Sequence, residues 1–557
     1  MTTESVPLKK KVKKIEGIKK PLMISGIIAA FAVTGIIVGI NIYSKTTQPE
    51  IVLYFCGYGL PYTIDPIDVT DPVDADVINQ VAEGLFDIDE NSEIINCLAT
   101  HHEWSTDDLN LTCTLRQGIK FHDGTPFNAT AVKWNVDRVY RLLDIVPFDF
   151  LWKLSDNRSI INETQVIDDY TVRFILNAPY APLLSLLAST YSYIVSPTST
   201  PADNFIDEIL VGTGPFIFDH FGNLTLSANQ HYWGGKPKFD KLVFLQISNE
   251  LVEDALLSGE IQMKKSVGFN ESILDSFRSN PSFNVVDGIP FPWVDFIVMN
   301  NKLINITMRK AISYAFNYSS YQYHYTFVRS KGPIPEGILY YNISGINVPY
   351  YNITIARQAL KDGNWPGTEL LTVNNNISAG NEWELVANSS TPLATYTYSA
   401  CYNWPRSIWY SDRIVKDLKQ IGVKVLPVII SFAEWLRRSE DIDGDHRDEV
   451  ELDYNFWLAD YNDPSNFINE FYTNKKIGYN MGQVNDTQVQ EWMEEAVIET
   501  DPNARRQLYY NIQKRLIEVV FPHVWLNSRT RIDIYISKLI GWYPHPIKDS
   551  FKNVSFV

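Results

Sequence analysis

The stretch that most constrains the fold of this chain runs from Leu109 to Arg138, LNLTCTLRQGIKFHDGTPFNATAVKWNVDR. Apolar and polar residues alternate over 111–116, which predicts a strand. Residues 118–126 are dense in turn formers. A helix is expected next, with Asn128 or Thr130 as its N-cap. Its apolar face, at helical spacing, comprises Val132, Val136, Val139 and Leu143. The stretch therefore predicts a packed strand–turn–helix unit.

Further segments follow the same kind of pattern. Residues 211–249 (VGTGPFIFDHFGNLTLSANQHYWGGKPKFDKLVFLQISN) predict strands around glycine-rich turns. Amphipathic spacing predicts helices over 308–321 and 411–421. Gly422 is the expected C-cap before a strand that ends near residue 426. The mixture predicts an α/β protein.

These strings resemble, in one order along residues 50–550, the extracellular solute-binding proteins of family 5, the peptide and nickel receptors of ABC importers. The resemblance is carried by LRQGIKFHDGTPFNATAVKWNVDR, GTGP, NxxYWGGKP, FDKLVF, MRKAISYAFNYSSY and YNITIARQALKDGNW. It implies a type II periplasmic-binding-protein fold, with two α/β lobes, interlobe crossovers and an extra domain inserted in lobe I. It also implies helices over 77–86 and 351–365 and a helix pair over 496–517. Its lobe I would cover 51–290 (insert about 80–205), lobe II 291–524, and a return to lobe I 525–557.

The N-terminus carries a separate signal. Residues 1–20 hold seven lysines, and 21–43 (PLMISGIIAAFAVTGIIVGINIY) hold no charge over a length that spans a bilayer. Lysines on one side keep that end in the cytoplasm. We expect a cytoplasmic tail, one transmembrane helix, a tether over 44–50 and an extracellular bulk at the cell membrane. The alternative is a cleaved signal peptide.

The charge balance excludes one class of partner. Residues 1–50 carry eight lysines and three glutamates, a net charge of +5, whereas the whole chain has a formal net charge of −17. The remaining residues therefore carry a net charge of −22. Such a surface repels nucleic acid. Roughly fourteen Asn-x-Ser/Thr sequons, among them Asn110, Asn128, Asn223, Asn305, Asn352 and Asn553, indicate a glycoprotein. Asn128 has the competing role of helix cap.

No metal or cofactor is expected. Four cysteines, Cys56, Cys97, Cys113 and Cys401, lack metal-ligand spacing. Outside a cell they allow one or two disulfides, and three pairings stay open. His101 and His102 are adjacent in a predicted strand, so they point to opposite faces. The acidic run 439–453 fails the EF-hand spacing.

The candidate ligand site is the segment WLADYNDPSNF at 457–467. It leaves a predicted strand over 454–458 and resembles the segment in peptide-binding members whose first Asp takes the ligand's α-ammonium; here that is Asp460. The backbone of Phe456 and Leu458 could pair with an extended peptide. Trp457, and Trp435 in the SFAEWLRR helix, match positions that line side-chain pockets. The alternative is that Asp460 only caps a turn.

The expected function is a receptor that captures oligopeptides in an interlobe cleft and delivers them to ABC permease subunits. Alternatives are an oligosaccharide receptor of the same fold and a glycosylated surface protein without a transport role. An enzyme is not expected, since no nucleophile elbow, Walker motif or HExxH is present.

Overall fold

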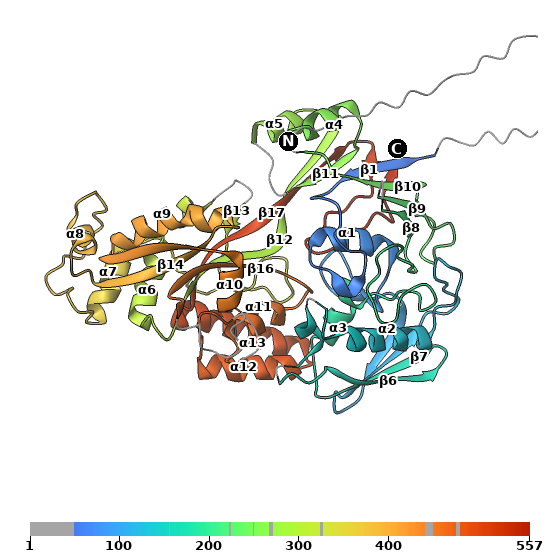
Figure 1. The fold of residues 1–557 in the computed structure, drawn as a ribbon, viewed down its shortest axis with the longest axis horizontal. Coiled ribbons are helices and arrows are strands. Elements are labelled where there is room, and N and C mark those ends of the chain that lie inside the picture. The colour runs from blue at the N-terminus through green and yellow to red at the C-terminus, as the bar shows by residue number, and fades with distance from the viewer. Residues whose placement is uncertain are drawn as a thin grey trace, which may run out of the picture. The chain divides into compact units, whose positions relative to one another are not determined.

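Two long strands connect the two halves of the described chain (Figure 1). They are β12 (Phe283–Met299) and β17 (His523–Ile536), paired antiparallel. Residues 291–299 are buried without a break, as expected for a strand covered on both faces. The pairing register shifts between 286 and 296, where Gly288 has φ 70° and two prolines lack the N–H of a regular ladder. The strands therefore bend as they cross.

The computed structural model describes residues 50–146, 148–154, 156–221, 224–248, 250–266, 271–322, 327–439, 449–474 and 480–557. The predicted cytoplasmic tail and transmembrane helix, with most of the tether, lie outside these residues. So does most of the acidic run at 439–453. Among the described residues, no helix is both long enough and apolar enough to cross a membrane.

Both long strands belong to one 11-stranded sheet. Its order is β15-β14-β16-β12-β17-β11-β1-β10-β9-β8, and β13 also pairs with β17. β1 runs parallel to β10 and β11, and β14 runs parallel to β15 and the start of β16. The other strands are β1 (Val52–Cys56), β8 (Phe216–His220), β9 (Thr225–Ala228), β10 (Lys241–Leu245), β11 (Met263–Ser266), β13 (Phe327–Arg329), β14 (Ala394–Cys401), β15 (Val423–Ile430) and β16 (Leu452–Leu458).

The strand–turn–helix prediction is confirmed. β5 (Asn110–Leu115) sits in a separate four-stranded sheet of order β4-β5-β7-β6, with β4 (Ala99–Trp104), β6 (Ile161–Asp168) and β7 (Thr171–Leu176). α2 (Ala129–Leu142) follows, and the side chain of Asn128 accepts from the N–H of Ala131, so Asn128 is the N-cap. The three valines of the predicted face are buried, and Leu143 is half-buried. This sheet and α2 lie within the same hydrophobic core as β1.

The helix predicted over 77–86 is displaced. α1 spans Pro72–Val81, five residues earlier. Its start is set by a capping box between Asp71 and Asp74 and by Pro72 in the first turn. Residues 82–88 leave the helix, and β2 (Phe86–Ile88) pairs with β3 (Ile94–Asn96).

Two of the quoted strings meet at Glu83. Its carboxylate accepts from Thr213 of GTGP at 2.7 Å and from Tyr232 and Trp233 of YWGG at 2.7 and 2.9 Å. Gly212 must be glycine, because a Cβ there would lie 2.2 Å from the carbonyl oxygen of Val81. Segments 130 to 150 residues apart are thus tied to the end of α1.

The helices of the C-terminal half are close to those predicted. α6 (Ile306–Ala315) ends before residue 321, and a 3-10 turn (Tyr318–Tyr321) completes that segment. α7 (Ile353–Asp362) lies inside its predicted range. α9 (Pro405–Lys419) begins six residues earlier than predicted, with proline in its first turn. Gly422 has φ 75° before β15. The C-terminal pair is α12 (Thr487–Ile498) and α13 (Pro502–Arg515), and α12 begins nine residues before the predicted range of 496–517.

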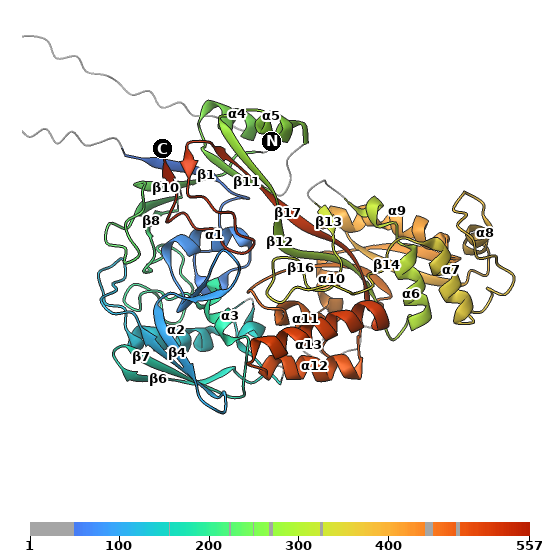
Figure 2. The ribbon, with the colours of Figure 1, turned by 180° about the vertical axis from the view of Figure 1, so that it is seen from behind.

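The remaining helices are short. In both views of the ribbon, α11 to α13 lie together beside the long strands (Figure 2). A C-terminal pair, β18 (Leu539–Ile540) with β19 (Ser555–Phe556), packs on the N-terminal core through Leu539 and Val554. The other helices are α3 (Leu183–Leu187), α4 (Val252–Ser258), α5 (Glu271–Arg278), α8 (Glu382–Asn388), α10 (Phe432–Ser439) and α11 (Ser465–Tyr472).

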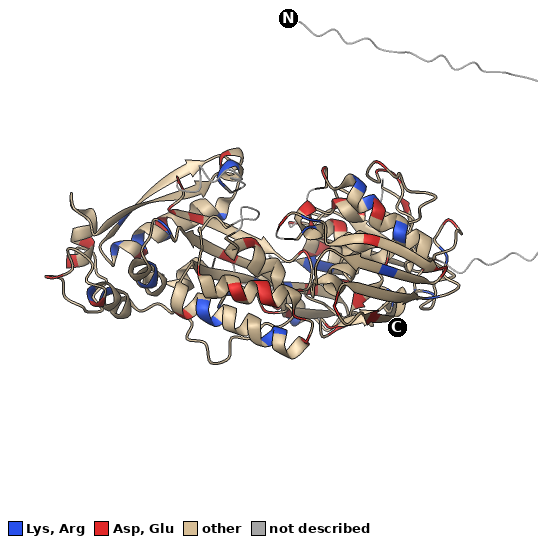
Figure 3. Cartoon of the chain, turned by 90° about the horizontal axis from the view of Figure 1, so that it is seen from below, with Lys and Arg blue, Asp and Glu red and all other residues tan. Residues whose placement is uncertain are grey.

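All four cysteines are buried with free thiols, so none of the three pairings forms in this structure. Acidic and basic residues are interspersed along the helices and strands of the described part (Figure 3). His101 is exposed near Glu103, whereas the ring of His102 packs edge-on against Phe86, centroids 5.1 Å apart. The two histidines face opposite sides of β4, as predicted.

Candidate ligand-binding site

A cavity of about 600 Å³ lies beside the long strands. One wall comes from α1, the 185–193 segment and the C-terminal 546–548 segment. The other comes from β12, α10, β16 and the loop after β16. The five candidate residues, Asp460, Trp457, Trp435, Phe456 and Leu458, all line this cavity. A volume of this size is typical of small-ligand sites.

The end of β16 is a free strand edge. On one side it pairs with β12, from Trp293↔Leu458 to Met299↔Leu452. On the other side, β14 pairs only with Leu452 and Asp453. Among the described residues, no strand therefore pairs with residues 454–458 on the side away from β12. The Phe456 N–H already donates to Asn455 Oδ1 at 2.7 Å, so an extended segment could add its own backbone hydrogen bonds at the remaining groups of this edge.

Asp460 is held in place by Asn466, the second residue of α11. Asn466 Nδ2 donates to Asp460 Oδ2 at 2.7 Å, and the Asp460 N–H donates to Asn466 Oδ1 at 2.9 Å. The same oxygen accepts from Trp457 Nε1 at 3.3 Å. From the opposite wall, the Tyr191 hydroxyl approaches Asp460 Oδ1 at 3.4 Å. Asp460 is thus oriented by neutral groups from both walls.

The negative charge of the Asp460 carboxylate is not balanced by a neighbouring cation among the described residues. Burial raises its pKa to about 6, against the hydrogen bonds from Asn466 and Tyr191. Among the described residues, no lysine or arginine forms an ion pair with it. A half-buried carboxylate without a cationic partner is costly to ionise. A cation brought into the cavity would remove that cost.

Aromatic rings form the floor next to Asp460. Phe456 stacks on Trp293, with centroids 4.5 Å apart and planes 7° from parallel. Trp404 meets Phe456 edge-on at 5.1 Å and Trp435 at 4.6 Å. Trp435 in turn stacks on Phe432 at 5.9 Å. These rings offer apolar area to a ligand's side chains or to a sugar face.

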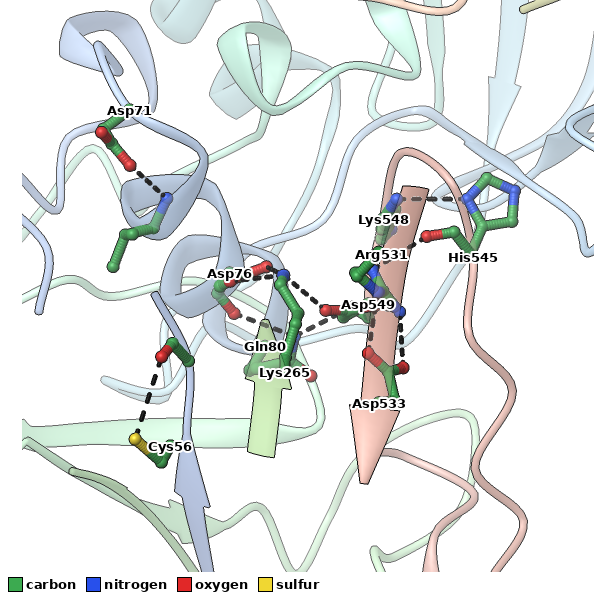
Figure 4. A network of polar contacts seen from close by, with 12 residues as sticks. Cys56, Asp71, Asp76, Gln80, Lys265, Arg531, Asp533, His545, Lys548 and Asp549 are labelled. Atoms are coloured by element: carbon green, nitrogen blue, oxygen red, sulfur yellow. Dashed lines mark hydrogen bonds and ion pairs between the residues drawn. The ribbon is translucent and has the colours of Figure 1, made fainter. Parts of the chain in front are cut away.

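Two of the cations at the cavity wall, Lys265 and Arg531, are already paired, as Figure 4 shows. Lys265 donates to both oxygens of Asp76 and to Asp549 Oδ2, at 2.6 to 2.7 Å. Arg531 forms a two-pronged pair with Asp533 and reaches Asp549 at 2.9 Å. Burial alone would lower the pKa of Lys265, but the charges of Asp549 and Asp76 outweigh it and raise that pKa.

Lys548, the third cation of the wall, pairs with Asp87 at 2.6 Å. All three cations therefore already have carboxylate partners within the protein. Asp460 on the opposite wall has no such partner among the described residues. Of the three acidic residues that line the cavity, Asp76 pairs with Lys265, Asp71 caps α1, and Asp460 has no cationic partner among the described residues.

Sequence reasoning missed the groups contributed by distant segments. At least one of the five candidates is contacted by each of Tyr191, Trp404, Trp293 and Asn466, and only Asn466 stands in the quoted segment. The strand–loop boundary at Asp460 was a usable signal. Nothing local in the sequence around Tyr191 points to Asp460. No group of three or more His, Cys, Asp or Glu in the described part of the chain is placed to hold a metal.

Comparisons with known proteins identify the architecture. The sequence model of the bacterial extracellular solute-binding proteins, family 5 (middle), matches residues 93–479. A glutathione-binding protein, GsiB, from Pectobacterium atrosepticum is 25% identical over 519 residues, 87% of this chain and 90% of the relative.

Two solved structures share the fold. HbpA2 from Haemophilus parasuis superposes with a TM-score of 0.76 at 21% identity, covering 91% of this chain and all of that one. The periplasmic protein DppA from Helicobacter pylori, in complex with the peptide STSA, gives 0.68 at 24% identity, covering 91% and 98%. The fold is therefore the α/β periplasmic-binding-protein fold.

Proposed function

Because this chain belongs to the bacterial extracellular solute-binding proteins of family 5, we propose that it is a receptor, not an enzyme, that captures short peptides and delivers them to ABC permease subunits. The observation that carries this proposal is the Asp460 carboxylate, which faces the cavity without a cationic partner among the described residues. Asp460 takes the α-ammonium of the peptide.

The chemistry at Asp460 supports an ammonium ligand. Its two oxygens are reached by one amide and one distant hydroxyl, so acceptor capacity remains. An ammonium in a closing cavity loses water and needs both a counter-charge and hydrogen bonds. The two hydrogen bonds with Asn466 fix the direction in which the Asp460 carboxylate offers its charge and its acceptor oxygens.

The neighbouring strand edge supports an extended peptide rather than a single amino acid. The edge at Phe456 and Leu458 leads directly to Asp460 along β16. A ligand whose ammonium meets Asp460 could therefore run along this edge as an added strand. Trp457 and Trp435 would then border its side chains. The cavity volume of about 600 Å³ favours a short peptide.

An oligosaccharide is the second candidate, because the rings of Trp404, Trp435 and Phe456 could stack on sugar faces. The test that separates the two uses one peptide in free and N-acetylated form. Calorimetry should give a 10²- to 10³-fold weaker affinity for the acetylated peptide, the order expected when a buried charge loses its partner. Equal affinities would remove the ammonium assignment and favour a neutral ligand.

The mutation Asp460→Asn should reproduce the effect of acetylation from the protein side. The matched control is Asp412→Asn, an exposed position on α9 that does not line the cavity. This control should bind the free peptide as the wild type does. If Asp412→Asn weakened binding as much as Asp460→Asn, a general loss of negative charge would explain both results.

The proposed mechanism is closure of two lobes about β12 and β17. The bends between 286 and 296 give these strands the irregular backbone on which a hinge could act. Ligand that contacts both walls stabilises the closed state, and that state docks on the permease. Small-angle scattering should show a smaller particle with peptide. An identical scattering curve, with a ligand that raises the melting temperature, would contradict hinge closure.

We also infer that residues 21–43 anchor the protein in the membrane, with residues 44–557 outside the cell. This inference rests on the uncharged run and on the lysines before it. Protease added to intact cells should degrade nearly the whole chain. Protection of the C-terminal part would reverse the topology.

We also propose that the extracellular part of the chain is glycosylated. None of the twelve sequon asparagines in the described residues is buried, whereas nine other asparagines are. A glycan acceptor must reach solvent, so this partition supports modification. None of the twelve lines the ligand cavity. A surface protein without a transport role remains the third candidate, and loss of peptide uptake on deletion would argue against it.

A further inference from the structure

A second cavity, of about 360 Å³, adjoins the candidate site. It lies between residues 150–158 and 178–180 on one side and α11 and α12 on the other. The two sides touch directly, since the Ala181 N–H donates to the Val497 carbonyl at 2.7 Å. Tyr461, the residue after Asp460, lines both cavities. The Phe150 ring of the second cavity lies 6.4 Å from the Trp457 ring of the first.

Two hydrogen-bond acceptors in this second cavity lack partners among the described residues. Glu470 is half-buried and, among the described residues, has neither a hydrogen bond nor an ion pair. The side-chain oxygen of its neighbour Asn469 is buried and accepts no hydrogen bond from the part of the chain that the structure describes. Both residues line the cavity. A buried acceptor without a donor is unfavourable, so the cavity is chemically incomplete as it stands.

Glu470 also lies close to the ammonium site. It follows Asn466 by four residues in α11, which places the two side chains on one face of the helix, about 6 Å apart at Cβ. Asn466 is hydrogen-bonded to Asp460. Two carboxylates therefore stand on either side of one asparagine, one facing each cavity.

The other charged groups around the second cavity do not neutralise Glu470. Lys153 pairs with Asp149, and Arg158 pairs with Asp156 at 2.7 Å. Glu494, on α12, adds negative charge to the lining. Burial, followed by the charge of Asp460, raises the pKa of Glu470 to about 8. The free protein thus holds a proton on Glu470 near neutral pH.

The remaining walls are suited to an aliphatic stem. Phe150, Leu151, Tyr180, Met493 and Val497 surround the acceptors with apolar and aromatic surface. Lysine and arginine side chains bury their methylene stems on such surfaces and carry the charge at the tip. The tip would meet Glu470 and Asn469, and the stem would pack on the rings.

We propose that this second cavity is a specificity subsite for a basic side chain, lysine or arginine, at or next to the N-terminus of the bound peptide. Glu470 and Asn469 accept the side chain's N–H groups while Asp460 accepts the α-ammonium. The subsite rests on the proposed peptide-receptor function and narrows its ligands to peptides with two positive charges near one end.

The test compares lysine with norleucine, which has the same aliphatic stem without the ammonium. Calorimetry of the full-length protein in detergent solution at pH 7 would use Lys-Ala-Ala against Nle-Ala-Ala and Ala-Lys-Ala against Ala-Nle-Ala. In at least one pair the lysyl peptide should bind at least tenfold more tightly. The variant Glu470→Gln should abolish that preference and leave the norleucyl peptides unchanged. The control Glu495→Gln, exposed on α12 and outside the lining, should keep the preference.

A second readout needs only the wild-type protein. Because ionised Glu470 is required for the cation, lysyl binding at pH 7 should release close to one more proton than norleucyl binding. Measurements in two buffers of different ionisation enthalpy give that number. Protons from the α-amino group cancel between the two peptides.

The outcomes distinguish the subsite from the receptor function. Equal binding of lysyl and norleucyl peptides, or a preference that survives Glu470→Gln, overturns the subsite and leaves the peptide receptor standing. Failure of all four peptides to bind overturns both. A lysyl preference without extra proton release places the ammonium away from Glu470 and also overturns the assignment.

Discussion

Asp460 and Asn466 hold each other by two hydrogen bonds, one through the Asp460 backbone N–H at 2.9 Å and one through its carboxylate at 2.7 Å. Asn466 is 1% exposed, so this arrangement is set inside the protein and does not depend on ligand. The carboxylate consequently points into the cavity before any cation arrives. Preorganisation of this kind lowers the entropy that binding must overcome.

Replacing Asn466 by alanine should therefore affect both stability and binding. The half-buried Asp460 loses the acceptor of its backbone N–H, and its carboxylate loses its orientation. We expect about 1–3 kcal/mol lower stability and roughly tenfold weaker peptide binding. Chemical denaturation and calorimetry measure the two. Asn284→Ala, at an exposed position of β12, should change neither. Unchanged binding by Asn466→Ala would mean that Asp460 needs no support.

Peptide affinity should depend on pH through Asp460. The pKa of its carboxyl is raised to about 6, and the ammonium requires the ionised form. For a peptide without basic side chains, affinity should be flat between pH 6 and 7. Below pH 6 it should fall by about tenfold per unit, because a proton must leave before the cation binds. Binding of the same peptide, without basic side chains, to Asp460→Asn should show no such fall.

The ligand-free protein should gain stability from Asp460→Asn. A raised carboxyl pKa means that the folded state binds the proton more tightly than the unfolded chain, so the associated stability is present below about pH 4 and lost as pH rises through about 6. Asparagine mimics the protonated acid at every pH. The variant should therefore be about 1–3 kcal/mol more stable than wild type at pH 8 and equal to it at pH 4. A destabilised variant at pH 8 would show that ionised Asp460 is satisfied in the free protein.

The ion pair of Asp463 and Arg505 should be important for stability. Asp463 is fully buried and receives two hydrogen bonds from the Arg505 guanidinium, at 2.5 and 2.8 Å. Arg505→Met leaves a buried carboxylate unpaired and should cost about 3–5 kcal/mol. Lys133→Met, which breaks an exposed pair with Asp137 on α2, should cost less than about 1 kcal/mol. Similar melting temperatures for the two variants would contradict the expected role of burial.

Gly212 should tolerate no side chain. An added Cβ would lie 2.2 Å from Val81 O and 2.6 Å from Ala82 Cα, both backbone atoms that cannot move aside cheaply. Gly212→Ala should lower stability by about 2 kcal/mol or more. Gly59→Ala is the matched control, because no atom lies within 4 Å of its added Cβ. A near-neutral Gly212→Ala would show that the end of α1 can shift.

Local patterns were sufficient for elements whose boundaries are set by nearby residues. The unit at 109–138 was predictable because alternation, turn residues and the Asn128 cap all act within a few positions. α1 was misplaced because its start depends on the capping box of Asp71 and Asp74, upstream of the apolar pattern. Its end depends on Glu83, which is held by residues far along the chain.

By itself, the sequence determined the family, the α/β character and the strand end that presents Asp460, because each of these depends on residues that are contiguous in the chain. Only the tertiary structure decided which groups stand opposite Asp460. Tyr191 reaches it across 269 residues, and the second cavity exists only where residues 150–180 meet α11 and α12. Contacts between segments so distant depend on how the whole sheet and its helices pack. No local spacing of residue types encodes them, because local spacing reports only which face of one element is apolar.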